Sequence, residues 1–148
     1  MRTIEFETIV PVAIDEVWAM FKKVEEYPQI IEYCHKAKLV GGFKEGSNWY
    51  DWSTVLIVPL KVNHQIEKIL PNAEIIYSIP LPFGVFLKQE SKLEGKSSRE
   101  TNVKMVVTIA FESKLLDSIL GNFVEYRNKR MISKTIENFH NRFKNANN

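Results

Sequence analysis

The stretch that decides the fold is VKMVVTIAFESKLLDSILGNF, residues 103–123. Apolar side chains alternate at Val103, Met105 and Val107, which is the two-residue period of a strand with one buried face. Helical spacing follows directly and predicts one long helix from about 113 to 145. A long helix that follows many strands can close the concave face of a curved sheet, and a functional site would lie between the two.

Composition points to a single domain covering residues 1–148. The chain has 148 residues, of which 45% are hydrophobic, enough for one core and too few for two comfortable domains. The 20 basic and 18 acidic residues are interspersed and give a net charge of +2, so nothing favours nucleic acid as a partner. Cys34 is the one cysteine, which excludes an intramolecular disulfide and indicates a reducing cytoplasm. No apolar run reaches the roughly 20 residues of a membrane span, so a soluble protein is expected.

The pattern along the chain predicts seven strands and three helices. Turn signals bound strands at about 2–10, 36–43, 47–57, 60–70, 73–80, 85–95 and 100–111. Two short helices lie between the first two strands, one capped by Asp15 with Trp18 in its core face, the other around Pro28. Hairpin links make the sheet mostly antiparallel. The expected architecture is an α+β helix-grip fold, a seven-stranded curved sheet wrapped around the long C-terminal helix.

This order of elements resembles the START and birch-pollen-allergen-like (SRPBCC) superfamily, which includes the polyketide cyclases. The segment 24–34, VEEYPQIIEYC, is most similar to the coenzyme Q-binding START-domain proteins and the ribosome-association toxins related to them. A second similar segment is 111–116, FESKLL, at the start of the last helix. Further matches fall along that helix at Gly121, Phe123, Met131, Phe139, Arg142 and Lys144.

The resemblance implies an internal cavity for a hydrophobic ligand such as a quinone, a lipid or a polyketide. One feature departs from the family pattern. A tryptophan commonly follows the family's Pro-Phe turn, whereas here Pro82-Phe83 is followed by Lys88, Gln89 and Glu90. An identical ligand pocket is therefore not expected.

Strand parity directs several polar side chains toward the interior. His64 shares a face with Val62 and Ile66, and Gln89 and Ser91 interrupt an otherwise apolar face. A buried polar group without a partner costs about 1–3 kcal/mol, so these groups bond one another, hold water or meet a ligand. The predicted ligand-binding residues are Val62, His64, Leu87, Gln89, Ser91, Met105, Leu116, Leu120, Phe123 and Arg127.

Other chemistries find little support in the sequence. The histidines, His35, His64 and His140, lack the spacing of a metal site, so neither a metal nor a cofactor is expected. Cys34 is interpreted as a buried structural thiol. The aromatic stretch 49–52, WYDW, lacks a neighbouring basic cluster in the sequence and is expected to fill core or line an apolar pocket.

Three functions remain open. The preferred one is non-covalent binding, for transport or chaperoning, of a hydrophobic small molecule by His64, Gln89 and Ser91 together with an aliphatic wall. A polyketide cyclase or dehydratase with His64 as general base is the alternative, but parity supplies only His64 as a clearly inward titratable group beside the less certain Arg127 and Lys68. The third is a partner-binding module of the ribosome-associated type.

Overall fold

The computed structural model describes residues 1–55 and 58–146. In chain order the elements are β1 (Arg2–Val10), α1 (Ile14–Lys22), the 3₁₀-helix η1 (Val24–Gln29), β2 (Cys34–Val40), β3 (Asn48–Val55), β4 (Val58–Leu70), β5 (Glu74–Leu81), the 3₁₀-helix η2 (Pro82–Gly84), β6 (Val85–Ser97), β7 (Glu100–Phe111) and α2 (Lys114–Ala146). The last positions of the predicted third strand, 56 and 57, lie outside the described residues.

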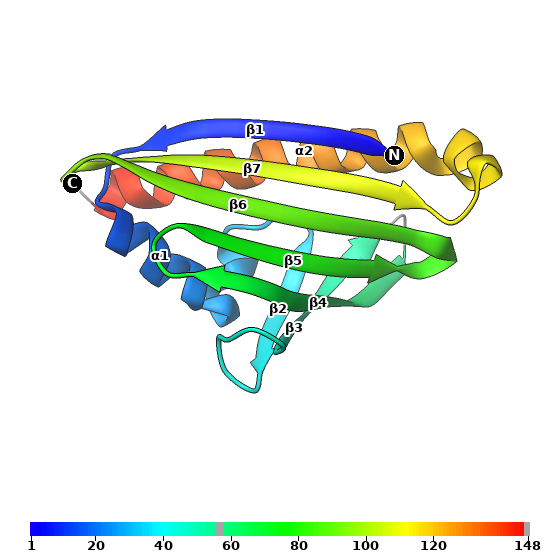
Figure 1. The fold of residues 1–148 in the computed structure, drawn as a ribbon, viewed down its shortest axis with the longest axis horizontal. Helices are drawn as coiled ribbons and strands as arrows, with labels where there is room; N and C mark the ends of the chain where they lie inside the picture. Colours follow the sequence, from blue (N-terminus) through cyan, green and yellow to red (C-terminus); the bar gives the residue numbers. More distant parts are fainter. Residues whose placement is uncertain (56–57, 147–148) are drawn as a thin grey trace.

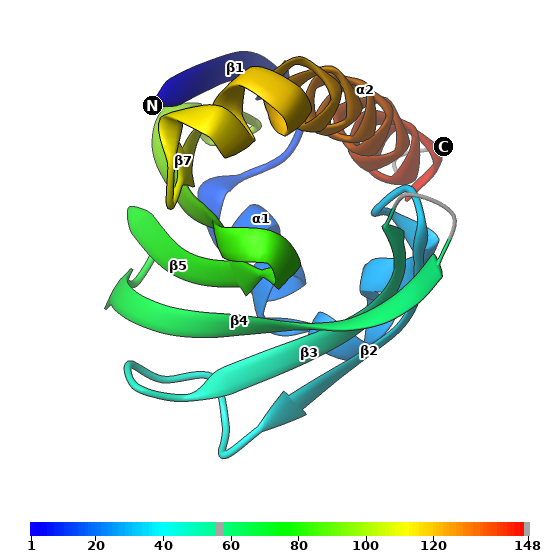
Figure 2. The same cartoon turned by 90° about the vertical axis from the view of Figure 1, so that its right-hand side faces the viewer.

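The strands form one antiparallel sheet in the order β1-β7-β6-β5-β4-β3-β2. Figure 1 shows α2 running beside β1 and β7, and Figure 2, turned by 90°, shows the sheet curving round to face α2. The predicted helix-grip α+β fold is therefore confirmed.

Strand parity places the core as the sequence predicts. Ile4 on β1 pairs with Val107 on β7, and both side chains are buried. Val103 and Ile109 on the same inner face are buried too. Since successive strand residues point to opposite faces, one regular register is enough to aim a whole row of side chains inward.

The second half of α2 plugs one end of the curved sheet. Phe139 packs against Phe21 of α1 with ring centroids 6.2 Å apart, and against Phe143 at 4.8 Å. Both α2 phenylalanines are buried. These large rings fill the interior at the end where α1 lies, which Figure 1 shows to be the end that carries the C-terminus.

One local expectation about the short helices is wrong. Asp15 does not cap α1, because the helix begins one residue earlier, at Ile14, and Ala13 occupies the N-cap position without a side-chain bond. Asp15 instead lies in the first turn, where its negative charge interacts favourably with the positive end of the helix dipole. The second short helix, η1, lies around Pro28 as expected.

Three large apolar residues that point toward the interior are only half-buried: Phe6, Met105 and Ile136. Met105 and Ile136 face the internal cavity described below, so part of their surface remains free. Phe6 packs against the cluster formed around Ile4 and Ile109. Their inward direction is as predicted, and the cavity explains the incomplete burial of Met105 and Ile136.

Trp18 belongs to the packed core and does not line the cavity. Its indole is 7% exposed and makes edge contacts with Phe21, at 6.4 Å, and with Phe43, at 6.0 Å.

Replacing Trp18 with alanine should lower the free energy of unfolding by about 3–5 kcal/mol, because the neighbouring rings cannot fill the space that the indole leaves. Urea denaturation measures the loss. Trp52→Ala is the matched control, since Trp52 is only half-buried on the outer face of β3, and its loss should be clearly smaller. Equal losses for the two variants would contradict the assignment of Trp18 to the core.

Candidate functional site

A mostly apolar cavity of about 240 Å³ lies between the sheet and α2. Its walls come from the inner faces of β3 to β7 and from the inward side of α2. The aromatic plug around Phe139 bounds one end. Phe83 of η2 and Phe123 of α2 line the cavity and are 70% and 43% exposed, so its mouth lies between them.

The structure brings nearly all of the predicted ligand-binding residues to this one cavity. They are Val62, His64, Leu87, Gln89, Ser91, Met105, Leu120, Phe123 and Arg127. Leu116 was placed wrongly, because it does not line the cavity. The first turn of α2, which holds Leu116, projects past the N-terminal end of β1 (Figure 1). That any of these residues binds a ligand stays a prediction.

His64, Gln89 and Ser91 do not form a hydrogen-bonded network of their own. Gln89 on β6 faces Tyr77 on β5, and the Tyr77 ring stands edge-on to the His64 ring at 6.4 Å. Tyr77 therefore separates the polar groups of β6 from His64. Of the hydrogen bonds found among the described residues, none joins these three side chains to one another.

The most polar part of the cavity wall is a pair that sequence reasoning missed. Asp51 Oδ2 lies 3.3 Å from His64 Nε2, and both side chains are less than a tenth exposed. Ser53 donates its hydroxyl hydrogen bond to Asp51 Oδ1. Parity could have found Asp51, since it alternates with Trp49 and Ser53 on β3, but the aromatic residues around it hid that pattern.

Burial shifts both members of the pair away from their charged forms. Loss of hydration raises the pKa of Asp51 to about 6, against the opposing hydrogen bond from Ser53. The same desolvation lowers the pKa of His64 to about 3, so the imidazole is neutral at physiological pH. The expectation that His64 would be the one clearly inward titratable group is therefore wrong. Lys68 lies away from the cavity and pairs with Glu74, with Nζ 2.5 Å from Oε2.

Aromatic rings hold His64 in place. The Trp49 indole stacks on the imidazole with centroids 3.6 Å apart and planes inclined by 15°. Tyr27 packs edge-on against Trp49 at 5.0 Å, and its hydroxyl donates to the backbone oxygen of Phe21. This packing fixes the orientation of the imidazole toward Asp51.

Several buried polar atoms of the cavity wall have no hydrogen-bond partner. They are Trp49 Nε1, His64 Nδ1 and Thr135 Oγ1. Most buried polar groups in folded proteins are paired, and an unpaired one costs about 1–3 kcal/mol. Unpaired atoms in the wall of a cavity therefore mark places where a bound molecule gains hydrogen bonds.

Arg127 of α2 contacts the β2–β3 side of the sheet instead of projecting freely into the cavity. Its guanidinium donates to the backbone oxygen of Thr54 and lies 4.3 Å from the centre of the Tyr33 ring. Cation–π and charge-assisted contacts of this kind hold α2 against the β2–β3 side of the sheet. Neither partner is an anion, so these contacts hold the guanidinium in place without neutralising its charge.

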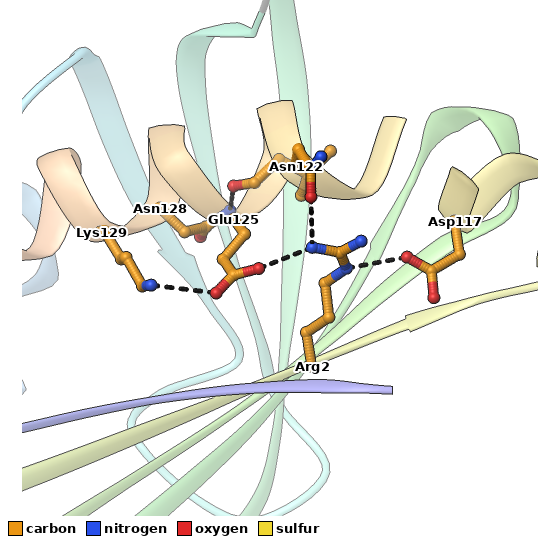
Figure 3. Close-up of polar contacts among 7 residues, drawn as sticks. Arg2, Asp117, Asn122, Glu125, Asn128 and Lys129 are labelled. Carbon is orange, nitrogen blue, oxygen red and sulfur yellow. Dashed lines mark hydrogen bonds and ion pairs between the residues drawn. The ribbon is translucent and has the colours of Figure 1, made fainter. Parts of the chain in front are cut away.

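A second set of polar contacts joins the start of β1 to α2, as Figure 3 shows. Arg2 Nε donates to Asp117 Oδ1 at 2.8 Å, and Nη1 donates to Asn122 at 2.9 Å and to Glu125 at 2.7 Å. A Cβ on Gly121 would lie 2.5 Å from Arg2 Nη2, so glycine makes room for this guanidinium. Gly121 therefore serves the contact with β1, not the cavity beneath the helix.

Most of the other residues considered for function lie outside the cavity. Cys34 is buried, and burial raises the pKa of its thiol to about 12, which agrees with a structural role. Of the three aromatic residues in the stretch 49–52, only Trp49 lines the cavity. Tyr50 and Trp52 lie on the other face, where Lys61 Nζ is 4.3 Å and 5.5 Å from their rings, so the structure supplies basic neighbours that the sequence order did not reveal.

Two kinds of feature are absent from the described residues. No group of three or more His, Cys, Asp or Glu in residues 1–55 and 58–146 is placed to hold a metal ion. No helix in that part of the chain is long and apolar enough to cross a membrane.

Comparison with known proteins gives likeness in structure only. No protein-family model and no curated protein matches the sequence. A START superfamily protein from Mycobacterium smegmatis superposes with a TM-score of 0.70 at 10% identity, over 97% of this chain and 98% of that one. Norcoclaurine synthase from Thalictrum flavum, in complex with dopamine and hydroxybenzaldehyde, gives 0.70 at 10% identity, over 91% and 83%.

A third similar structure is the di-domain ARO/CYC BexL from the BE-7585A biosynthetic pathway. Its TM-score is 0.73 at 16% identity, and the match covers 94% of this chain but 46% of BexL. At such identities the likeness shows a shared fold.

The Asp51–His64 pair should leave a distinct signature in the pH dependence of stability. Between about pH 4 and 6 the folded pair carries one proton, on Asp51, and the unfolded pair also carries one, on His64. The wild-type pair thus contributes almost no slope in this window. In Asp51→Asn, the unfolded state alone binds a proton below pH 6.5, so stability should fall by about 1.4 kcal/mol per pH unit on acidification.

His64→Gln should do the opposite. The folded state then binds a proton on Asp51 below about pH 6 while the unfolded chain does so only near 3.8, so stability should rise as the pH falls between these values. Urea denaturation of the wild type and both variants from pH 7 to 4.5 measures these differences. Variants that run parallel to the wild type would show that the two groups are not buried together.

Proposed function

We propose that this chain, which has the helix-grip fold of the START and birch-pollen-allergen-like superfamily, binds a hydrophobic small molecule without covalent chemistry. A quinone-, lipid- or polyketide-like ligand would lie in the cavity between the sheet and α2, carried or protected there. The observation that carries the proposal is a mostly apolar cavity of about 240 Å³ whose wall also holds buried, unpaired polar atoms.

The apolar wall supplies the affinity. Side chains that line an empty space lose dispersion contacts with partners on that side, and apolar surface transferred from water contributes about 25 cal/mol per Å². Leu87, Val107 and Leu120 present such surface from β6, β7 and α2. A hydrophobe of fitting size would regain these contacts.

The polar wall supplies orientation. Trp49 Nε1 and Thr135 Oγ1 have unmet hydrogen-bonding capacity, and Gln89 and Ser91 add polar atoms on β6. A few polar groups on an otherwise apolar wall are typical of small-molecule sites. Phe83 and Phe123 at the mouth give the ligand an apolar path inward.

A neutral fluorescent hydrophobe, N-phenyl-1-naphthylamine, tests the proposal. The wild type should bind one molecule with increased fluorescence, and Leu87→Trp, which fills the cavity from β6, should weaken binding by about tenfold or more, a difference of about 1.4 kcal/mol. Leu70→Trp is the control, because Leu70 lies at the exposed end of β4 away from the cavity. Binding that survives in Leu87→Trp, or fails equally in Leu70→Trp, would place the probe elsewhere.

General acid–base catalysis is the second candidate, favoured by the Asp51–His64 pair. A carboxylate whose pKa lies near 6 is suited to take a proton at neutral pH. The simplest reaction it supports is enolisation of a bound ketone. Asp51 removes a proton from the carbon beside the carbonyl, the carbon–hydrogen electron pair forms the enolate, and return of a solvent-derived proton restores the ketone.

Deuterium exchange at the α-carbon of 2-tetralone, a neutral aromatic ketone, measures this activity by NMR in D2O. A catalyst would accelerate exchange above the buffer rate, and Asp51→Asn would abolish the acceleration while Asp15→Asn, an exposed aspartate of α1, would not. Wild-type exchange at the buffer rate would leave the chain a binder of ligands and remove this candidate.

A further inference from the structure

The cavity wall contains a carboxylate with unused acceptor positions. A carboxylate offers about four lone-pair sites, and Asp51 uses Oδ1 for the Ser53 hydroxyl, while His64 Nε2 lies 3.3 Å from Oδ2. The side chain is 8% exposed and lines the cavity. A ligand that reaches this end of the cavity meets an acceptor that still has capacity.

Among the described residues, no lysine or arginine forms an ion pair with Asp51. Arg127 is the one Lys or Arg among the described residues that line the cavity, and its guanidinium is held by the Thr54 carbonyl and the Tyr33 ring. His64 stays neutral, because burial lowers its pKa. Of the other titratable neighbours, the Cys34 thiol keeps its proton at neutral pH. The polar end of the cavity is therefore negative when Asp51 is ionised.

The same end of the cavity also contains an unpaired donor. Trp49 lies two positions before Asp51 on the same face of β3, and its indole Nε1 can only donate. His64 Nδ1 on the neighbouring strand is also buried without a hydrogen-bond partner. A matching ligand group must therefore both donate and accept hydrogen bonds.

We propose that the cavity selects an uncharged hydrophobic molecule that carries a hydroxyl group, which donates to Asp51 and accepts from Trp49, and that it excludes carboxylates. A hydroxyl has one donor and two acceptor positions. A carboxylate only accepts and would add a second anion at low dielectric, and an ammonium only donates and leaves the indole unpaired. The inference rests on the proposed ligand-binding function and narrows its ligand to alcohols, phenols and quinols, as opposed to fatty acids.

A set of ligands that differ only in the head group tests this selection. 1-Decanol, decanoate and decylammonium compete with bound N-phenyl-1-naphthylamine at pH 7.5. We expect 1-decanol to displace the probe from the wild type at a concentration about tenfold lower than decanoate, because the acid brings a like charge toward Asp51. Decylammonium should be weaker than 1-decanol in spite of its attraction to Asp51, because a buried ammonium loses more hydration than a hydroxyl and leaves the indole unpaired.

Neutralising Asp51 should remove the discrimination. In Asp51→Asn the concentrations of 1-decanol and decanoate should agree within about threefold, mostly through tighter binding of decanoate. Asp15→Asn makes the same change of charge at an exposed position of α1 and should keep the wild-type ratio. Asp51→Ser is a second neutral variant in case the asparagine variant does not fold.

The outcomes separate the two proposals. Failure of the wild type to bind N-phenyl-1-naphthylamine would overturn the ligand-binding function itself. Probe binding with equal displacement by 1-decanol and decanoate would overturn the selection alone, as would tighter binding of decylammonium. The wild-type ratio decides even if neither variant of Asp51 folds.

Discussion

The concave face of the sheet is wider than one helix can cover, and the rest of the structure follows from that mismatch. α2 packs directly on β1 and β7, at one edge of the sheet. The inner faces of the remaining strands curve away from it (Figure 2). Large rings of α1 and α2 fill the interior at one end only, so an apolar volume remains beneath the middle of the helix.

Two sets of polar contacts hold α2 in place and prevent it from packing into this volume. Arg2 ties α2 to β1, and Arg127 ties the same helix to the backbone of β3 across the sheet's opening. Because α2 is held at both sides, the shape of the cavity depends on these contacts and not on a bound molecule. A preformed cavity of this kind reduces the ordering cost of binding.

The polar end of the cavity lowers stability in return for selectivity. Asp51 and His64 lose hydration on folding, and this burial shifts the pKa of each group toward its neutral form. An apolar pair of equal volume would pack there at lower cost. Such local violations of the hydrophobic pattern are expected at functional sites.

How far the sequence predicts this structure depends on the range of the interactions. Regular strands carry their parity with them, so Val62, His64 and Gln89 point inward as predicted. The position of a helix relative to the sheet is not encoded locally, which is why Leu116, on the correct helix, does not line the cavity.

Contacts between segments that are distant in the sequence could not be predicted either, because local sequence patterns do not encode them. Neither the hydrogen bond from Arg127 to Thr54 nor the approach of Arg2 to Gly121 leaves a signal in the neighbouring sequence. Asp51 is different, since the alternation from Trp49 to Ser53 predicts its direction. Aromatic neighbours on both faces of β3 obscured that regular pattern.

Methyl NMR of the protein titrated with N-phenyl-1-naphthylamine tests the central claim most directly, that the apolar interior is a binding site. The account predicts saturable shifts for methyl groups of the cavity wall, those of Ile79, Leu87 and Leu120, and none for Val12 and Val17 in the packed core. Shifts confined to Leu115 and Ile119, which are exposed on the outer side of α2, would show binding at the surface and contradict it.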